Sequence, residues 1–192
     1  MATDLQSSAP ICVDLDGTLV CTDTLWECLI AAWRKDFWLF FLFPIWLLRG
    51  RAYLKYEAAR HANLDVDTLP YDADLVNWLA EQRDRGRRIL LVTGSSGAVA
   101  NKVAQKLGLF SEVFSSTKTL NLSGQNKLKA LQDHFQGKEF EYIGDSSADV
   151  PIWSYLGKAH TRGASKQLCA RLGFESEELH DIFSRPPYSL KS

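Results

Sequence analysis

The stretch that decides the fold is Ile11-Cys12-Val13-Asp14-Leu15-Asp16-Gly17-Thr18-Leu19-Val20. Its apolar, β-branched beginning predicts a short strand that delivers two aspartates, one residue apart, into a glycine turn. Residues i and i+2 of a strand point the same way, so Asp14 and Asp16 can share one site at the strand's end. Two carboxylates that close repel each other, which implies a bound cation or a shared proton. We therefore expect a catalytic site in which one carboxylate attacks and the other moves protons.

Further strands and helices follow this stretch in alternation. Strands are predicted over 11–15, 88–92, 113–114, 140–143 and 158–161, and helices over about 98–107, 126–135, 148–155 and 166–172. This alternation predicts an α/β fold whose parallel sheet is covered on both faces. Ligands of open α/β sheets bind outside the carboxyl ends of the strands. Asp14, Thr93 and Asp145 each follow a predicted strand, so three distant segments converge on one place.

A long helical insertion separates the first two strands. Thr24-Leu25-Trp26-Glu27 is typical of a capping box that opens a helix, and Pro44 is expected to break or kink the apolar run that follows. Further helices are expected over 52–62 and around Leu75 and Leu79, with a loop over 65–70. The resulting domain prediction is a core over 1–22 and 87–183, a helical cap over 23–86 and a tail or linker over 184–192.

The insertion contains an unusual aromatic segment, 37–48, which is twelve residues long and carries no charge. Four basic residues bracket it: Arg34, Lys35, Arg49 and Arg51. The segment is too short to span a bilayer, which needs about 20 apolar residues. Two interpretations stay open. The segment is either a buried helical hairpin or a surface that contacts the membrane interface, where aromatic and basic side chains are favoured.

Composition limits the class of protein. The 192 residues are 46% hydrophobic and carry a net charge of −1, which fits a folded globular chain and provides no electrostatic case for binding nucleic acid. The four cysteines, Cys12, Cys21, Cys28 and Cys169, lack CxxC spacing and favour reduced thiols. Residues 1–10 lack the features of a signal peptide. We expect a cytoplasmic protein, attached peripherally to the inner membrane if the aromatic segment contacts lipid.

Four motifs in the chain resemble those of the haloacid dehalogenase (HAD) superfamily, most of whose members are magnesium-dependent phosphatases. The first, DxDGT, matches Asp14 to Thr18, and the second matches Thr93. The third matches Lys127, and the fourth, GDxxxD, matches Gly144 to Asp149. The resemblance implies a Rossmann-like parallel sheet, the HAD core, with a helical cap inserted in it. More narrowly, the chain is similar to the phosphatase-like domain in front of UbiA-type polyprenyl transferases, whose membrane domain begins like residues 185–191.

The resemblance also assigns chemical roles. Asp14 would be the nucleophile that forms an aspartyl-phosphate, and Asp16 would protonate the leaving oxygen and later deprotonate water. The cofactor would be Mg²⁺, held by Asp14, the backbone carbonyl of Asp16, and Asp145. Asp149 would be a further metal ligand or would hold the other ligands in position without touching the metal. The simpler interpretations are an Asx turn at Asp14 and Asp16 and a helix cap at Asp145.

Phosphate binding is assigned in the same way. Thr93 and the amides of Gly94 and Ser95 would hold the phosphoryl oxygens at a helix N-terminus. Lys127 would offset the charge of the phosphate. The alternatives are a plain N-cap role for Thr93 and the replacement of Lys127 by its neighbour Lys129 in the site.

Three functions remain open at this stage. The first is a phosphatase acting on a lipid-linked or prenyl-linked phosphate, such as a phosphorylated polyprenyl-phosphosugar. The second is a soluble small-metabolite phosphatase whose cap is a lid. The third is a non-catalytic module that regulates a membrane prenyltransferase. The expected partners are accordingly a phosphorylated small molecule or lipid, and a membrane surface or prenyltransferase domain, with no nucleic acid.

Overall fold

The computed structural model describes residues 9–157, 159–162, 168 and 179–181, and its centre is one parallel sheet. The strand order is β3-β2-β1-β4-β5-β6, and every neighbouring pair is parallel. The strands are β1 (Ile11–Val13), β2 (Ile89–Ser96), β3 (Glu112–Ser116), β4 (Glu141–Gly144), β5 (Ala159–Thr161) and β6 (Leu179–Asp181). The predicted α/β fold with a Rossmann-like parallel sheet is thus confirmed.

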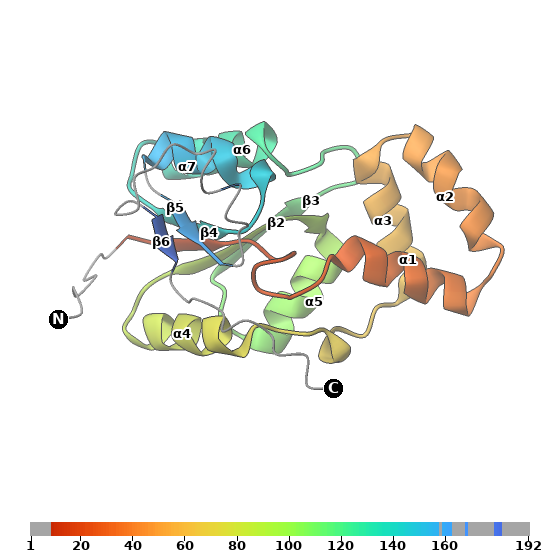
Figure 1. Ribbon diagram of the computed structural model, residues 1–192, viewed down its shortest axis with the longest axis horizontal. Coiled ribbons are helices and arrows are strands. Elements are labelled where there is room, and N and C mark those ends of the chain that lie inside the picture. The colour runs from red at the N-terminus through yellow and green to blue at the C-terminus, as the bar shows by residue number, and fades with distance from the viewer. Residues whose placement is uncertain (1–8, 158, 163–167, 169–178, 182–192) are drawn as a thin grey trace.

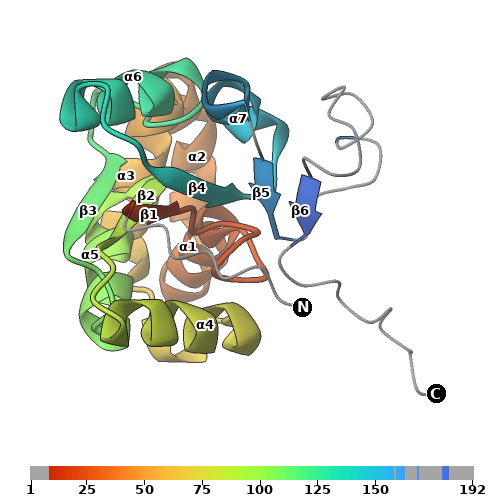
Figure 2. The same cartoon turned by 90° about the vertical axis from the view of Figure 1, so that its left-hand side faces the viewer.

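Helices cover both faces of the sheet (Figures 1 and 2). α6 (Gln125–Phe135) and α7 (Val150–Leu156) lie on one face, and α4 (Ala73–Asp84) and α5 (Gly97–Leu107) lie on the other. The strands alternate between the two interfaces because successive side chains point to opposite faces. Ile11 and Val13 join the cluster on the α5 side, and Cys12 between them joins the cluster on the α6 side. This double burial holds β1 at the centre of the core.

Three helices stand together at one end of the molecule (Figure 1): α1 (Thr24–Lys35), α2 (Leu39–Leu48) and α3 (Arg51–Ala62). Two short 3₁₀ turns, η1 (Val66–Thr68) and η2 (Ser147–Asp149), complete the helical elements described. α4 falls inside the expected cap range of 23–86, yet it lies beside α5 against the sheet (Figure 2). The domain boundaries themselves stay a prediction.

Two local expectations for the insertion are wrong. Asp23, rather than Thr24, caps α1, because its carboxylate accepts a 2.8 Å hydrogen bond from the amide of Leu25. Pro44 does not break the apolar run, since α2 continues through it, whereas the alternative of a kink stays a prediction. Proline removes the hydrogen bond to the carbonyl four residues earlier and its ring crowds that carbonyl, but packing elsewhere can still hold the turn. The expected loop over 65–70 contains η1.

Some expectations fall outside the described residues: the helix over 166–172 apart from Leu168, the tail over 184–192, and Cys169. Cys12 and Cys28 are buried free thiols, in keeping with the expected reduced state. Among the described helices, none combines the length and the apolar character needed to cross a membrane.

Candidate active site

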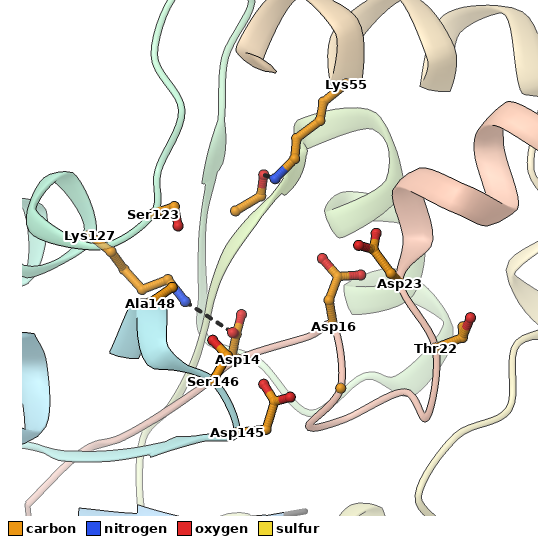
Figure 3. Close-up of a pocket in the computed structure, with 12 residues that line it drawn as sticks. Asp14, Asp16, Thr22, Asp23, Lys55, Ser123, Lys127, Asp145, Ser146 and Ala148 are labelled. Atoms are coloured by element: carbon orange, nitrogen blue, oxygen red, sulfur yellow. Dashed lines mark hydrogen bonds and ion pairs between the residues drawn. The ribbon is translucent and has the colours of Figure 1, made fainter. Parts of the chain in front are cut away.

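The predicted convergence is at the carboxyl ends of β1, β2 and β4, where a pocket of about 300 Å³ opens (Figure 3). β1 lies between β2 and β4, with Val13 opposite both Leu91 and Ile143. This register places the residue after β1, Asp14, close to the residue after β4, Asp145. The lining is polar: Asp14, Asp16, Gly17, Thr22, Asp23, Lys55, Gly94, Ser123, Lys127, Asp145, Ser146 and Ala148.

Three carboxylates meet in this region. Asp14, Asp145 and Asp149 each offer an oxygen, and the three oxygens lie within 4.8 Å of one another. The Asp14 carboxylate accepts a 2.8 Å hydrogen bond from the amide of Leu15 at Oδ1, and Thr18 Oγ1 donates to Asp145 Oδ1 at 3.3 Å. Three of the four predicted metal-binding aspartates are therefore brought together. The carboxylate of Asp16 is not a member of this group.

Lys127 is the cation that pairs with Asp14. Only 2% of it is exposed, and its Nζ lies 3.1 Å from Asp14 Oδ2 and 3.1 Å from Asp149 Oδ1. Burial alone would lower the pKa of Lys127, but the two carboxylates more than offset this and raise it. The competing lysine, Lys129, forms an exposed ion pair with Asp133 on the outer side of α6. The geometry therefore favours Lys127.

Asp149 is fully buried, and hydrogen bonds occupy both of its oxygens. Oδ1 accepts from Lys127 Nζ and from the Tyr142 hydroxyl at 2.6 Å, and Oδ2 accepts from Ser146 Oγ and from the amides of Asp145 and Ser146. A carboxylate has about four lone-pair sites, so little capacity remains for an ion. Of its two expected roles, these contacts favour support of Lys127 and of the β4–η2 turn.

Asp16 lines the same pocket but is tied to the cap. Its Oδ1 accepts a 2.7 Å hydrogen bond from the amide of Thr24, the first residue of α1, and its Oδ2 accepts from the Ser95 hydroxyl. The hydroxyls of Thr24 and Ser95 lie 2.6 Å apart. The second aspartate of the first motif thus links the core sheet to the start of the cap.

The three residues that were predicted to bind the phosphoryl group lie in a strand that leads into a helix. Thr93, Gly94 and Ser95 remain inside β2, and α5 begins only at Gly97, with Ser96 as its N-cap. α5 thus begins close to the predicted start at about residue 98, whereas the alternative N-cap role for Thr93 is wrong. Thr93 is buried and its Oγ1 accepts a hydrogen bond from the Ser95 amide, so of the three only Gly94 lines the pocket.

Sequence reasoning missed Lys55. It lies on α3, lines the pocket, and donates a 2.7 Å hydrogen bond from Nζ to the carbonyl of Gly94 (Figure 3). Burial lowers the pKa of Lys55, and nearby carboxylates oppose that change. One lysine within a helix of mixed polarity carries no local signal, so only the packing of α3 over β2 could reveal this residue.

The pocket has an excess of negative charge that suits a divalent cation. Four carboxylates and two lysines line it. Burial raises the pKa of Asp14 to about 7, although Lys127 lowers it, and burial with Asp149 raises the pKa of Asp145 to about 6. Two carboxylates that resist ionisation so close together need added positive charge. Hard carboxylate oxygens are ligands that Mg²⁺ prefers, so the residues fit this ion.

We expect Mg²⁺ to raise the melting temperature more at about pH 8 than at about pH 5, because protons compete with a cation for Asp14 and Asp145. Without metal, the raised pKa values of Asp14 and Asp145 make the protein less stable as the pH rises. The native state binds more protons than the unfolded state between the two sets of pKa values, so these groups reduce stability as the pH rises. Thermal unfolding with and without MgCl₂ measures both effects, and Asp145→Asn should remove most of the Mg²⁺ effect. An equal Mg²⁺ effect at both pH values would contradict the assignment.

Gly17 of the DxDGT motif allows the carboxylate of Asp145, from the GDxxxD motif, to lie close to its backbone. Its φ is +74°, and a Cβ added there would lie 2.7 Å from the carboxyl carbon of Asp145. We expect Gly17→Ala to displace this carboxylate and to reduce activity about 100-fold, since small misplacements of reacting groups have effects of this size.

The matched control is Gly137→Ala, where φ is +83° and nothing lies within 4 Å of the added Cβ. It carries the same backbone strain of about 1–2 kcal/mol without a clash, so it should lose stability but not activity. Hydrolysis rates and urea unfolding of both variants make the comparison. Equal activities would show that the approach of Gly17 to Asp145 is unimportant.

Comparison with known proteins identifies the family. A family model described as haloacid dehalogenase-like hydrolase matches residues 11–154. The chain belongs to this family. The broader resemblance that the four motifs predicted is therefore confirmed, whereas the narrower resemblance to a domain joined to UbiA-type transferases stays a prediction.

Individual proteins are similar to this chain in sequence or in fold. The chain is 36% identical over 183 residues to the uncharacterized protein y4nM of Sinorhizobium fredii, covering 95% of this chain and 35% of that protein. The chain thus spans about a third of the relative's length. The fold is similar to that of a substrate-bound phosphoserine phosphatase, with a TM-score of 0.60, 18% identity, and coverage of 85% of this chain and 90% of the other. A Bordetella pertussis protein of unknown function has a TM-score of 0.63 and 14% identity, with coverage of 91% and 99%.

Proposed function

We propose that this chain is a Mg²⁺-dependent phosphatase that hydrolyses phosphate monoesters through an aspartyl-phosphate on Asp14. The observation that carries the proposal is the environment of that carboxylate. Asp14 is only 7% exposed, opens into the pocket, and lies 3.1 Å from the ammonium of Lys127. A nucleophilic carboxylate needs this kind of fixed position beside a cation that balances the incoming phosphate.

In the first step, a carboxylate oxygen of Asp14 attacks phosphorus and the bond from phosphorus to the leaving oxygen breaks. Asp16 donates a proton to that oxygen, so the alcohol leaves neutral. In the second step, water attacks the phosphorus of the aspartyl-phosphate while Asp16 takes its proton. The bond between phosphorus and the Asp14 oxygen then breaks, which releases inorganic phosphate and restores the free carboxylate.

Asp14, Asp145 and the backbone carbonyl of Asp16 would hold Mg²⁺, which when bound neutralises charge on the phosphoryl oxygens. Asp149 holds Lys127 and the β4–η2 turn in place through its five hydrogen bonds. Lys127 from α6 and Lys55 from α3 provide positive charge from two sides of the pocket (Figure 3). The amide of Gly94 remains our proposed backbone donor to the phosphoryl group.

The lining also bears on the substrate. Among the described residues, no large apolar side chain lines the pocket. This polarity favours a small, hydrophilic phosphate ester as the group that enters it. A lipid-linked substrate would place its headgroup in the pocket and its chain outside. Assays of phosphorylated sugars and of prenyl-linked phosphates in parallel would separate the soluble and lipid-linked alternatives.

The proposed intermediate can be trapped with Asp16→Asn. With ³²P-labelled p-nitrophenyl phosphate, the leaving group needs no proton, so we expect label to enter the protein and to leave it slowly. The label should be stable to acid quench, be released by hydroxylamine, and require Mg²⁺. Asp14→Asn is the matched control and should take up no label.

Two results would overturn the proposal. One is equal labelling of Asp14→Asn and Asp16→Asn, which would place the phosphoryl group elsewhere. The other is no turnover of any phosphate monoester in a broad screen of the folded protein with Mg²⁺. That second result would favour the non-catalytic module that regulates a membrane prenyltransferase.

A further inference from the structure

α2 is apolar on all sides but packs on only one. Its buried residues are Leu39 and Trp46, whereas Trp38 just before the helix is 73% exposed and Leu48 at its end is 88% exposed. Phe37, Phe40, Phe41, Leu42, Ile45 and Leu47 are also exposed. Of the two interpretations that the sequence left open, the buried hairpin is therefore wrong for most of this segment. The surfaces of soluble proteins rarely carry such a continuous apolar patch unless it binds a partner.

The patch is ordered by its own contacts. Phe37, Trp38, Phe40 and Phe41 form what we call the aromatic edge, in which the rings of Trp38, Phe37 and Phe40 each lie 5.8–5.9 Å from that of Phe41. On the opposite side, Trp46 stacks on His61 of α3 at 5.4 Å. The helix is thus anchored to the cap through Trp46, with the aromatic edge facing outward. α2 lies at the outer end of the cap, away from the sheet (Figure 1).

The surrounding charges favour one kind of partner. Arg34 and Lys35 precede the patch, Arg49 and Arg51 follow it, and all four are exposed. Asp36 is the only acidic residue between them, although the whole chain carries a net charge of −1. A second copy docked on the same patch would bring these four cations against four like charges, which is unfavourable. An anionic lipid surface would attract them and accept the aromatic rings at the headgroup level.

We propose that the aromatic edge and its four basic neighbours dock the cap onto an anionic lipid surface. The exposed residues Trp26, Ile30 and Trp33 extend the apolar surface along one face of α1, because residues at i, i+4 and i+7 share a helix face. α2 has ten residues and is about 15 Å long, so it can lie in the interface but not cross it. This inference does not depend on the proposed phosphatase activity.

The test is cosedimentation of the full chain with vesicles of phosphatidylcholine, with and without phosphatidylglycerol. Two variants address the patch: Trp38→Ser/Phe41→Ser removes rings, and Arg34→Glu/Arg51→Glu reverses charges. Their controls are Leu120→Ser/Tyr155→Ser, which replaces two other exposed large side chains by serine, and Lys129→Glu/Lys138→Glu, which makes the same change in net charge at exposed positions of the core. We expect the patch variants to lose at least about tenfold in partition coefficient on anionic vesicles, and the controls to match the wild type.

Quenching of tryptophan fluorescence by brominated lipids adds a measure of depth. Trp38→Phe should lose a large part of the quenching while keeping vesicle binding. Three results would overturn the proposal: no binding to anionic vesicles, binding that neither patch variant reduces, or self-association in sedimentation velocity that the patch variants abolish without any lipid binding. The last would make this surface a contact between copies of the chain.

Discussion

Asp14→Asn should reduce hydrolysis of p-nitrophenyl phosphate in the presence of Mg²⁺ on the order of 10⁴-fold or more, as expected for loss of a covalent nucleophile. Asparagine keeps the size of the side chain and can still accept the hydrogen bond from the Leu15 amide. It cannot attack phosphorus as a carboxylate does, and it no longer pairs with Lys127 or provides a charged metal ligand. The loss should appear in kcat, measured by steady-state kinetics.

The matched control for this substitution is Asp133→Asn. Asp133 lies on the exposed side of α6, where its carboxylate pairs only with Lys129 among the contacts described. The same chemical change there should leave kcat and KM unaltered. If Asp14→Asn kept activity within a factor of about ten of the wild type, another residue would have to be the nucleophile.

Lys127→Met should produce the largest loss of stability. The ammonium lies within 3.1 Å of both Asp14 and Asp149 and donates a 2.7 Å hydrogen bond to the Tyr142 hydroxyl. Removing one member of a buried charge network leaves the other charges uncompensated, which typically costs about 3–5 kcal/mol in the free energy of unfolding. Urea denaturation without Mg²⁺ at about pH 8, above the pKa of Asp14 in the wild type, measures this loss.

The pH dependence of the loss identifies its cause. Asp14 has a pKa of about 7 with Lys127 present, and removal of the lysine raises that pKa further. Below it, Asp14 becomes neutral and no longer needs a cation, so the loss should be smaller at about pH 5 than at about pH 8. The control, Lys129→Met, changes an exposed lysine two residues away and should stay within about 0.5 kcal/mol of the wild type. A loss that was the same at both pH values would indicate lost packing instead of unpaired charge.

Several parts of the fold could be predicted because their signals are local. β1 and β2 are short apolar runs, and α5 and α6 have amphipathic spacing, so each could be located to within a few residues. The placement of Asp14 and Asp145 followed from one general rule about the carboxyl ends of parallel strands. The family motifs then selected Lys127, which a spacing argument alone would not have separated from Lys129.

Other features of the site depend on contacts between distant segments. Ser95 donates a hydrogen bond to Asp16 and so connects the end of β2 to the first motif. Lys55 reaches Gly94 only because α3 packs over the end of β2. Asp149 is occupied by groups from α6, β4 and η2, which no local pattern in the GDxxxD motif indicates.

The aromatic segment, 37–48, shows both what the sequence determines and what only the tertiary structure decides. Its residue order alone determined that an uncharged apolar segment with basic neighbours lies in the insertion, since that can be read directly from the chain. Tertiary structure alone decided that Trp46 turns inward while Trp38 and Phe41 face outward. A helix that is apolar on every side carries no periodicity to say which face is buried, so the choice depends on what α3 and α1 leave uncovered.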